Sequence, residues 1–357
     1  MSKKANLLAL VRKHQNKNKR SDIYFSLSTC VKLILEQTPE DVFVMVFGKR
    51  TRCPKPVLTT ILSSPAKAQD FVSFQPFALD TLLISVKTNK VIDIHGAISD
   101  IENKVIKTVG PPEEILSKRP FLAIRVAALV AETGFSPTKG ILDAISNNKN
   151  KLEQGGYKNT WKELKRLLRA DKPSRGIEFL REVGILKTIL PELEDCYGVE
   201  QNTLYHKYTV YEHCLLACDC CDRKDVRLRL AALIHDIGKP TTAGKNERGV
   251  TFHKHEVEST KLARTIMARF GLKRRDSIFI VSLVQNHMYQ YDRKWKDTTV
   301  RKFIKRVGLT QNFIGRLRDF PLFKLRNADR MGRDLPPITQ KQRDFESRLE
   351  NMLNYKG

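Results

Sequence analysis

One ten-residue segment limits the folds and functions open to this chain more than any other. Residues 231–240, AALIHDIGKP, join a run of small and apolar residues to His235 and Asp236, and Gly238 and Pro240 then end the helix. Adjacent His and Asp residues at a helix end can present an imidazole nitrogen and a carboxylate oxygen to one cation. The segment therefore predicts a helical domain that holds a divalent metal.

Four further residues extend this pair into an ordered set of metal-ligand types. They lie within or beside mainly apolar stretches that predict helices: His213, His255, His287 and Asp329. The Asn-Ala-Asp context favours Asp329 over the nearby Asp319 and Asp334. A single histidine in an apolar helix is more often a hydrogen-bonded core residue than a ligand, but the ordered set predicts a metal centre.

The ligand types indicate the chemistry of such a centre. Imidazole and carboxylate ligands together accept Mn, Mg, Ni, Co, Fe or Zn, so the sequence predicts a divalent metal without selecting one. A cation of this kind lowers the pKa of bound water and polarises a phosphoryl oxygen. We expect His255, His287 and Lys239 to neutralise negative charge on a phosphate substrate. Lys239 is equally placed to contact carbonyl groups at the helix end.

The charge balance predicts a polyanionic partner. The chain has 64 Lys and Arg residues against 39 Asp and Glu residues, a formal net charge of +25. Each phosphate that a protein neutralises releases condensed counterions, which favours nucleic-acid binding. A solvated basic surface without a ligand is the alternative. Basic side chains concentrate in residues 1–22 and in the region 145–175, where WKELKRLLRA predicts an amphipathic helix with a cationic face. The predicted RNA contacts are Arg125, Lys158, Lys162, Lys165, Arg166, Arg169 and Arg175.

Nothing in the sequence predicts a membrane span or a secretory signal. No apolar run approaches the ~20 residues that a spanning helix requires, and no hydrophobic segment follows the basic N-terminus. Cys214, Cys218, Cys220 and Cys221 lack the paired spacing of a zinc ribbon, so we expect reduced, partly buried thiols. These features favour a cytoplasmic protein without a membrane partner.

Hydrophobic patterning divides the chain into an α/β region followed by helical regions. Three segments rich in β-branched and aromatic residues predict strands, namely residues 41–47, 81–86 and 91–94. The Gly-Pro-Pro sequence within residues 107–114 predicts a break that no helix crosses. Residues 121–131, FLAIRVAALVA, predict a buried helix that Gly134 ends.

The ordered ligand set resembles the H…HD…D pattern of the HD phosphohydrolase superfamily. The matching residues are His213, His235, Asp236 and Asp329. The resemblance implies an all-α bundle in which these four residues hold one catalytic metal. His255 and His287 match positions that, in some HD proteins, hold a second metal or contact the scissile phosphate.

A wider resemblance covers roughly residues 70–335. Residues 91–114, 119–138 and 176–213 resemble, in this order, the end of the head, the neck helix and the body-to-HD junction of bacterial CCA-adding enzymes. These are the tRNA nucleotidyltransferases related to poly(A) polymerases. The resemblance implies a head that adds C, C and A to tRNA and a basic neck and body that bind tRNA. It further implies an HD domain with phosphatase and cyclic phosphodiesterase activity.

The head departs from this family's pattern at the positions that carry its chemistry. The sequence has no Gly-Ser or Gly-Gly loop followed by an Asp-x-Asp pair. The family's Arg-Asp-Phe-Thr-Ile-Asn-Ala-Leu segment corresponds to residues 72–79, VSFQPFAL, and its Glu-Asp-x-x-Arg element falls on Lys118, Arg119 and Leu122. Two-metal phosphoryl transfer requires carboxylates that hold magnesium. We therefore predict a shortened head that has kept its fold and lost its reaction.

Together these features predict a mainly α protein with a truncated α/β nucleotidyltransferase-like head, a helical neck and body, and an all-α HD domain. The predicted segments are a basic arm (1–22), the degenerate head (23–116), an RNA-binding neck and body (117–204), the HD domain (205–335) and a C-terminal helix (336–357).

The predicted function is metal-dependent hydrolysis of a phosphate at an RNA terminus. A 2′,3′-cyclic phosphate, a 2′-phosphate or a terminal monoester is the expected substrate, with tRNA as the carrier, in RNA end processing or repair. Two alternatives stay open. In the first, nucleotide addition is retained by this chain or completed by another chain. In the second, the chain binds tRNA without catalysis. A third, milder alternative is an HD enzyme that acts on free nucleotides.

Overall fold

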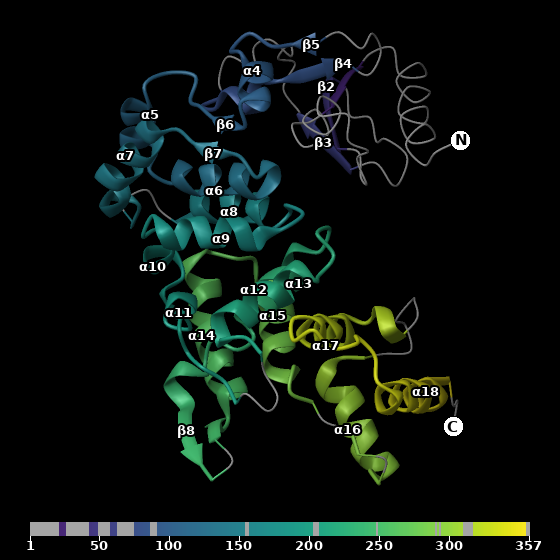
Figure 1. Cartoon of the computed structure of the whole chain (residues 1–357). Coiled ribbons are helices and arrows are strands. Elements are labelled where there is room, and N and C mark those ends of the chain that lie inside the picture. Colours follow the sequence, from purple (N-terminus) through teal and green to yellow (C-terminus); the bar gives the residue numbers. More distant parts are fainter. Residues whose placement is uncertain are drawn as a thin grey trace. The chain divides into compact units, whose positions relative to one another are not determined.

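Most of the chain is described by the computed structural model (Figure 1). The described residues are 21–25, 43–48, 58–62, 75–85, 91–153, 157–202, 207–247, 249–289, 291–292, 294–309 and 317–354. The chain comprises two compact units, Met1–Lys151 and Leu152–Gly357. Helices dominate among the described residues, which confirms the predicted mainly α fold.

The first unit contains the five-stranded sheet of the α/β region. Its strands are β1 (Ser21–Phe25), β2 (Phe43–Gly48), β3 (Leu58–Leu62), β4 (Leu83–Ser85) and β5 (Val91–Ile92). They lie in the order β3-β2-β1-β4-β5; β2 and β3 are parallel, and the other neighbours are antiparallel. A strand lies in each of the three predicted segments. In the second segment, however, Thr81 ends the 3-10 helix η1 (Ala78–Thr81), where its hydroxyl donates to the carbonyl of Ala78.

The predicted Gly-Pro-Pro break separates two helices of the first unit. α4 (Ala97–Glu102) ends before the break, and α5 (Pro112–Lys118) begins at its second proline. α6 (Leu122–Thr133) is buried on most faces, and Gly134, with φ 73°, ends it as predicted. The unit is completed by the parallel pair β6 (Val105–Ile106) and β7 (Ser136–Pro137), by α7 (Lys139–Asn148) and by η2 (Lys149–Lys151).

The second unit opens with the predicted amphipathic helix. α8 (Tyr157–Leu167) buries Leu164 and Leu167 completely and leaves most of its lysines exposed. Three shorter helices follow: α9 (Pro173–Glu182), α10 (Leu186–Ile189) and α11 (Pro191–Glu194).

A bundle of helices forms the core of the second unit. Its members are α12 (Val210–Asp219), α13 (Val226–Ile234), α14 (His255–Arg269), α15 (Arg274–Asn286) and α17 (Pro321–Met331). α13 packs against α12, α15 and α17, and α14 packs against α15. The start of α12 is fixed by a capping box between Thr209 and Glu212, and the start of α13 by the Asp225 side chain. Between α13 and α14 lie η4 (Pro240–Thr242) and the antiparallel hairpin of β8 (Ala243–Asn246) and β9 (Gly249–Phe252).

The C-terminal segment packs through a cluster of aromatic rings. It contains α16 (Asp297–Val307), η5 (Leu317–Asp319) and α18 (Gln340–Asn354), the last of which is the predicted C-terminal helix. Phe345 of α18 is fully buried and stacks on Tyr291, with ring centroids 4.2 Å apart. Leu349, one turn further along, is also fully buried.

The unit boundary and the predicted segment boundaries do not coincide. The change from one unit to the next at residues 151 and 152 lies inside the predicted neck and body, residues 117–204. Of the predicted basic arm, residues 1–20 lie outside the described residues, and the last two residues begin β1. The predicted segment boundaries therefore stay predictions.

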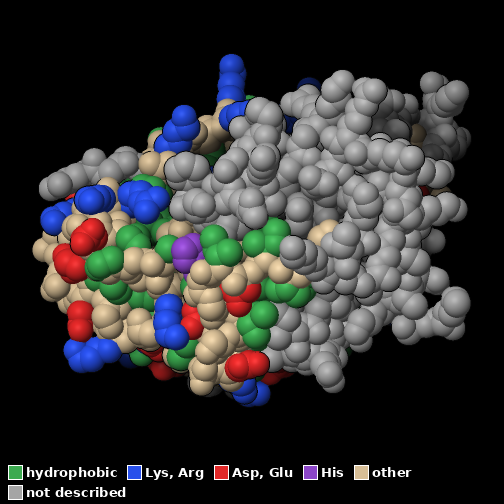
Figure 2. Space-filling view, turned by 90° about the horizontal axis from the view of Figure 1, so that it is seen from above, with side chains coloured by type: hydrophobic (Ala, Val, Ile, Leu, Met, Phe, Trp, Pro, Cys, Tyr) green, Lys and Arg blue, Asp and Glu red, His purple; other side chains and the backbone are tan. Residues whose placement is uncertain are grey.

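The described residues can be compared with the expectations for membrane helices, cysteines and surface charge. No helix in the described part of the chain is both long and apolar enough to cross a membrane. The described cysteines are free, and all of them except Cys220 are buried. On the described part of the face in Figure 2, Lys and Arg side chains alternate with Asp and Glu, and hydrophobic side chains lie exposed between them.

Candidate metal centre

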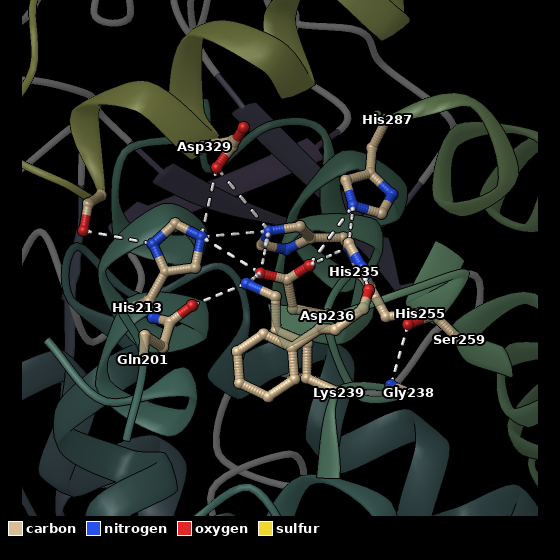
Figure 3. Close-up of polar contacts among 12 residues, drawn as sticks. Gln201, His213, His235, Asp236, Gly238, Lys239, His255, Ser259, His287 and Asp329 are labelled. Carbon is tan, nitrogen blue, oxygen red and sulfur yellow. Dashed lines mark hydrogen bonds and ion pairs between the residues drawn. The ribbon is translucent and has the colours of Figure 1, made fainter. Parts of the chain in front are cut away.

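The predicted ligands converge inside the helical bundle of the second unit (Figure 3). His213 lies on α12, His235 and Asp236 directly follow α13, and Asp329 lies near the end of α17. His255 begins α14, and His287 follows α15. All six side chains are buried, His213 and His235 completely. Residues from five helices, which are far apart in sequence, thus meet at one place.

The turn after α13 reaches this place because residue 238 is glycine. The amide of Gly238 donates to the hydroxyl of Ser259 on α14 at 2.8 Å. A Cβ at this position would lie 2.5 Å from both the carbonyl oxygen of His255 and the amide nitrogen of Ser259. Any larger residue would push α14 away. Gly238 therefore has two roles. It ends the helix, as the sequence predicts, and it sets the distance between the His235–Asp236 pair and His255.

The tautomers of the four histidines follow from their hydrogen bonds. The Nδ1 atoms of His235, His255 and His287 lie 2.7–2.8 Å from the carbonyl oxygens three residues earlier. The Nδ1 atom of His213 lies 3.3 Å from the carbonyl oxygen of Gly332. A carbonyl oxygen only accepts, so each Nδ1 carries the proton and each Nε2 of a neutral ring presents a lone pair. Histidines that bind metals use this arrangement.

The Nε2 atoms of His213 and His235 form one group with two carboxylates. They lie 3.1 Å apart, and His213 Nε2 lies 3.2 Å from Asp329 Oδ1. Asp236 Oδ2 lies 3.5 Å from the Nε2 of His213 and 3.3 Å from that of His235. Ligands bound at ~2.1 Å to one cation are separated by about 3.0–3.4 Å. Two lone pairs that face each other this closely are repulsive unless a cation lies between them.

A second group shares Asp236 with the first. The Nε2 atoms of His255 and His287 lie 3.4 Å apart, and Asp236 Oδ1 lies 3.2 Å and 3.3 Å from them. Among the described residues, no donor reaches this buried oxygen with hydrogen-bond geometry, despite these short distances. An unsatisfied buried carboxylate oxygen between two imidazole nitrogens fits a cation site. The two oxygens of Asp236 therefore face two potential cation positions.

The surroundings keep both carboxylates ionised. Burial by itself would raise the pKa of Asp236, but neighbouring positive charge, including the Lys239 ammonium, holds it well below its usual range. Burial acts in the same direction on Asp329, whose pKa is nevertheless lowered by nearby positive charge, including that of Arg333. Ionised carboxylates are the ligand state that divalent metals require.

Two arginines hold Asp329 in position. Arg326 and Arg333, one turn before and one turn after it on the chain, each donate to Asp329 Oδ2 at 3.1 Å. The other oxygen, Oδ1, is left to face His213. The alternatives Asp319 and Asp334 are more than half exposed and pair with Lys324 and Lys207 instead. The preference for Asp329 thus agrees with the geometry.

Lys239 is buried beside the centre. Its ammonium lies 2.6 Å from Asp236 Oδ2 and donates to the side-chain oxygen of Gln201 at 2.7 Å. Gln201 in turn donates to the carbonyl of Tyr208. Of the two roles that the sequence left open for Lys239, this contact with a candidate ligand favours the one at the site.

Sequence reasoning missed the residues that support the ligands. Gln201, Ser259, Arg326, Arg333 and Gly332 carry no motif of their own. Their roles depend on contacts with residues far away in sequence or on helix faces that only packing defines. The single available signal was Gly332, the glycine directly after α17, the helix that carries the candidate ligand Asp329.

The predicted RNA contacts fall into separate places. Lys158, Lys162 and Lys165 on α8, together with Arg169, line one hollow on the second unit, which we call the basic hollow. Arg166 and Arg175 are not part of its lining. Arg125 belongs to the first unit, where it is 14% exposed and forms an ion pair with Asp80 at 2.9 Å. This ion pair gives Arg125 a structural role that the sequence did not reveal.

Two protein families match parts of the chain. The family described as "HD domain" matches residues 203–330. The family described as "Probable RNA and SrmB- binding site of polymerase A" matches residues 134–197. The first match contains every residue of the metal centre except Gln201, Gly332 and Arg333.

Individual relatives and a solved structure point the same way. An A-adding tRNA nucleotidyltransferase of Deinococcus radiodurans is 28% identical over 253 residues, which are 68% of this chain and 57% of that protein. A multifunctional CCA protein of Methylobacillus flagellatus is 30% identical over 241 residues, 64% of this chain and 56% of that protein. The CCA-adding enzyme of Bacillus stearothermophilus in complex with CTP matches with a TM-score of 0.50 at 16% identity, over 98% of this chain and 82% of that one. The aligned regions span little more than half the length of the two relatives. These matches confirm the resemblance to the CCA-adding enzymes.

Proposed function

We propose that this relative of the CCA-adding enzymes, with its HD domain, is a metal-dependent phosphohydrolase that acts on phosphates at RNA termini. A 2′,3′-cyclic phosphate, a 2′-phosphate or a terminal monoester is the proposed substrate group, and tRNA is the proposed carrier. The observation that carries the proposal is the convergence of four imidazole Nε2 lone pairs on Asp236 and Asp329.

In the proposed site, His213, His235, Asp236 and Asp329 hold one divalent cation. His255 and His287, with the second oxygen of Asp236, hold another cation or contact the phosphate. A bound cation would supply Lewis-acid polarisation of a phosphoryl oxygen and a lower pKa for water. Mn, Mg, Ni, Co, Fe and Zn all remain compatible with this mixed nitrogen and oxygen donor set.

The other residues have roles that follow from their contacts. Lys239 lies beside Asp236 and places a positive charge where negative charge develops on the phosphate oxygens. Gln201 holds the Lys239 ammonium in position. Arg326 and Arg333 keep one Asp329 oxygen turned toward His213. RNA is held by cations outside the metal centre, because phosphate contacts position a nucleic acid without reading its sequence.

Nucleotide addition is the second candidate function. The names of the similar proteins favour it, since they include an A-adding tRNA nucleotidyltransferase and multifunctional CCA proteins. The sequence of the head argues against it, because Lys118, Arg119 and Leu122 occupy the Glu-Asp-x-x-Arg positions and the Asp-x-Asp pair is missing. Incorporation of labelled CTP or ATP into tRNA that lacks its 3′ end would support this candidate.

The test of the proposed function is a hydrolysis assay on RNA that ends in a 2′,3′-cyclic phosphate. The full chain is assayed with each divalent metal and with EDTA, beside the double variant His235→Ala, Asp236→Ala. A matched control is His253→Ala, which removes an exposed histidine two residues before His255. The proposal is supported if the native chain releases product only when a divalent metal is present and the double variant releases none.

Failure of the assay has distinct meanings. Equal release by the double variant would place the activity elsewhere. No release with any metal, together with salt-dependent tRNA binding, would favour a binding protein without catalysis. Hydrolysis of a generic phosphodiester that tRNA does not inhibit would favour a free nucleotide as substrate.

A further inference from the structure

The basic hollow has a volume of about 760 Å³ and lies entirely within the second unit. Three segments bound it: α8 with Arg169 just beyond its end, residues 222–227 at the start of α13, and residues 270–276, which follow α14 and include the first turn of α15. Its volume lies in the range of pockets that bind ligands of nucleotide size. None of the residues of the candidate metal centre lines it.

Positive charge exceeds negative charge in this hollow. Seven basic and three acidic side chains line it. Asp276 lies 3.4 Å from Arg227, and Asp225 is used as the cap of α13 and lies 3.9 Å from Arg227. Five of the cations have no ion pair with any carboxylate in the described part of the chain: Lys158, Lys162, Lys165, Arg169 and Lys273.

These cations are close enough to affect one another. Partial burial lowers the pKa of Lys165, and the charges of Arg169, Lys162 and Lys273 lower it further, although Asp276 acts in the opposite direction. Repulsion of this kind is relieved when an anion binds among the cations. The arrangement therefore favours a ligand with several negative oxygens.

An aromatic surface forms another part of the wall. The half-buried ring of Trp161 stacks on Phe270, with centroids 5.9 Å apart and an angle of 21° between the planes. The ammonium of Lys165 lies 5.6 Å from the centre of the Trp161 ring. Cations combined with an aromatic surface are typical of sites that bind the phosphates and the bases of nucleotides together.

From this arrangement we propose that the basic hollow binds a nucleoside phosphate. The cations hold the phosphate, and the base lies against the wall that contains Trp161. The nucleotide belongs to a bound RNA strand or is a free nucleoside polyphosphate, since both present the same chemistry. The proposal stands independently of catalysis at the metal centre.

Three helices, α13, α14 and α15 (labelled in Figure 1), each have residues of the hollow at or beside one end and residues of the candidate metal centre at or beside the other. α13 begins at the hollow and ends at His235, and α15 begins with residues of the hollow and ends at His287. α14 runs in the opposite sense, from His255 to Phe270. At 1.5 Å per residue, these helices span about 14–22 Å. The two sites therefore occupy opposite ends of one layer, and one small nucleotide does not fill both.

The test uses Trp161 as its own reporter. The chain has two tryptophans, so the variant Trp295→Phe leaves Trp161 as the sole emitter. This full-length variant is titrated with a short single-stranded RNA, with ATP, and with unphosphorylated adenosine. We expect a saturable change of Trp161 emission with the RNA or with ATP, and none with adenosine. A change of emission with the RNA alone identifies an RNA strand as the source of the nucleotide. A change with ATP at comparable affinity identifies a free nucleotide.

A charge variant distinguishes the hollow from general electrostatics. Lys162→Gln, Arg169→Gln removes two exposed cations, and Lys302→Gln, Lys305→Gln removes two exposed cations from α16 as the control. The first pair is expected to weaken binding at least tenfold and, for RNA, to reduce the salt slope of log K by about 1.4. The control is expected to stay within twofold. Equal weakening by both pairs, equal binding of adenosine, or no change in Trp161 emission would overturn the proposal.

Discussion

The α-carbon of Gly332 lies directly against the backbone of Ala217, where α17 ends beside α12. A Cβ at Gly332 would lie 2.8 Å from the amide nitrogen and 3.1 Å from the Cα of Ala217. The carbonyl of the same glycine accepts the Nδ1 hydrogen of His213. One residue therefore sets both the distance between two helices and the orientation of His213, a candidate metal ligand.

This relationship predicts the effect of Gly332→Ala. The methyl group meets backbone atoms that cannot rotate away, so we expect a loss of about 1–3 kcal/mol in the free energy of unfolding, with weaker stabilisation by metal. Urea denaturation with and without metal measures both effects. Gly110→Ala is the control, since its Cβ would meet its nearest atom at 3.9 Å. Unchanged stability in Gly332→Ala would show that α17 moves freely past α12.

Metal binding predicts a change in thermal stability. A cation that binds the folded chain at 100 times its Kd adds about 2.7 kcal/mol to the free energy of unfolding. We expect the melting temperature to rise with at least one divalent metal, to fall again with EDTA, and not to respond in His235→Ala. His253→Ala is expected to respond like the native chain. A response in His235→Ala that matches the native one would exclude this residue as a ligand.

The two arginines beside Asp329 predict a graded effect. Arg326→Gln, Arg333→Gln leaves every ligand in place but removes the charged groups that orient Asp329. Metal affinity is expected to fall 10- to 100-fold while the chain remains folded. Isothermal titration with the metal measures the affinity. Arg330→Gln on the same helix is the control, because Arg330 donates to the carbonyl of Pro336 instead; equal losses in both would contradict the assigned role.

Substitution of Gln201 is predicted to change the rate of hydrolysis without changing metal binding. Gln201→Leu removes the acceptor of the Lys239 ammonium, so we expect kcat to fall about tenfold while stabilisation by metal is kept. Gln201→Glu preserves an acceptor for Lys239 and is expected to retain more activity. Steady-state kinetics on the cyclic phosphate substrate provide the comparison. Loss of metal binding in Gln201→Leu would mean that Gln201 shapes the ligands themselves.

Substitution of Arg229 is predicted to affect the stability of the fold alone. This arginine is 2% exposed and donates to the carbonyls of Cys221, Leu168 and Ala170, so it joins α13 to the end of α8. Arg229→Met leaves three buried acceptors unsatisfied, and we expect a loss of about 3 kcal/mol in the free energy of unfolding. The control Arg227→Met removes an arginine that is 37% exposed, and is expected to cost less than ~1 kcal/mol. Comparable losses would indicate that the carbonyls find other donors.

Local patterns predicted several features that the structure contains. The helix of residues 121–131 ends at Gly134 because only a residue tolerant of positive φ continues the chain there. The leucine spacing of α8 predicted its buried face, since helical periodicity depends on nearby residues alone. The order of His213, His235, Asp236 and Asp329 predicted a candidate ligand set, and the structure brings these four residues together.

Packing decided what local patterns leave open. Thr81 lies in a 3-10 helix rather than a strand, where its hydroxyl satisfies a backbone carbonyl. Arg125 pairs with Asp80, 45 residues away, although the sequence analysis included it among the predicted RNA contacts.

The sequence by itself determined the helical class, the mixed nitrogen and oxygen donors of the candidate ligand set, and the excess of positive charge. Only the tertiary structure decided which carbonyls fix the histidine tautomers, that the two oxygens of Asp236 face two candidate cation positions, and which cations share one hollow. The physical reason is that ligand types and helical periods are local properties of the chain. Orientation, burial and charge clustering arise instead from contacts between residues such as His213 and Gly332, which are 119 positions apart.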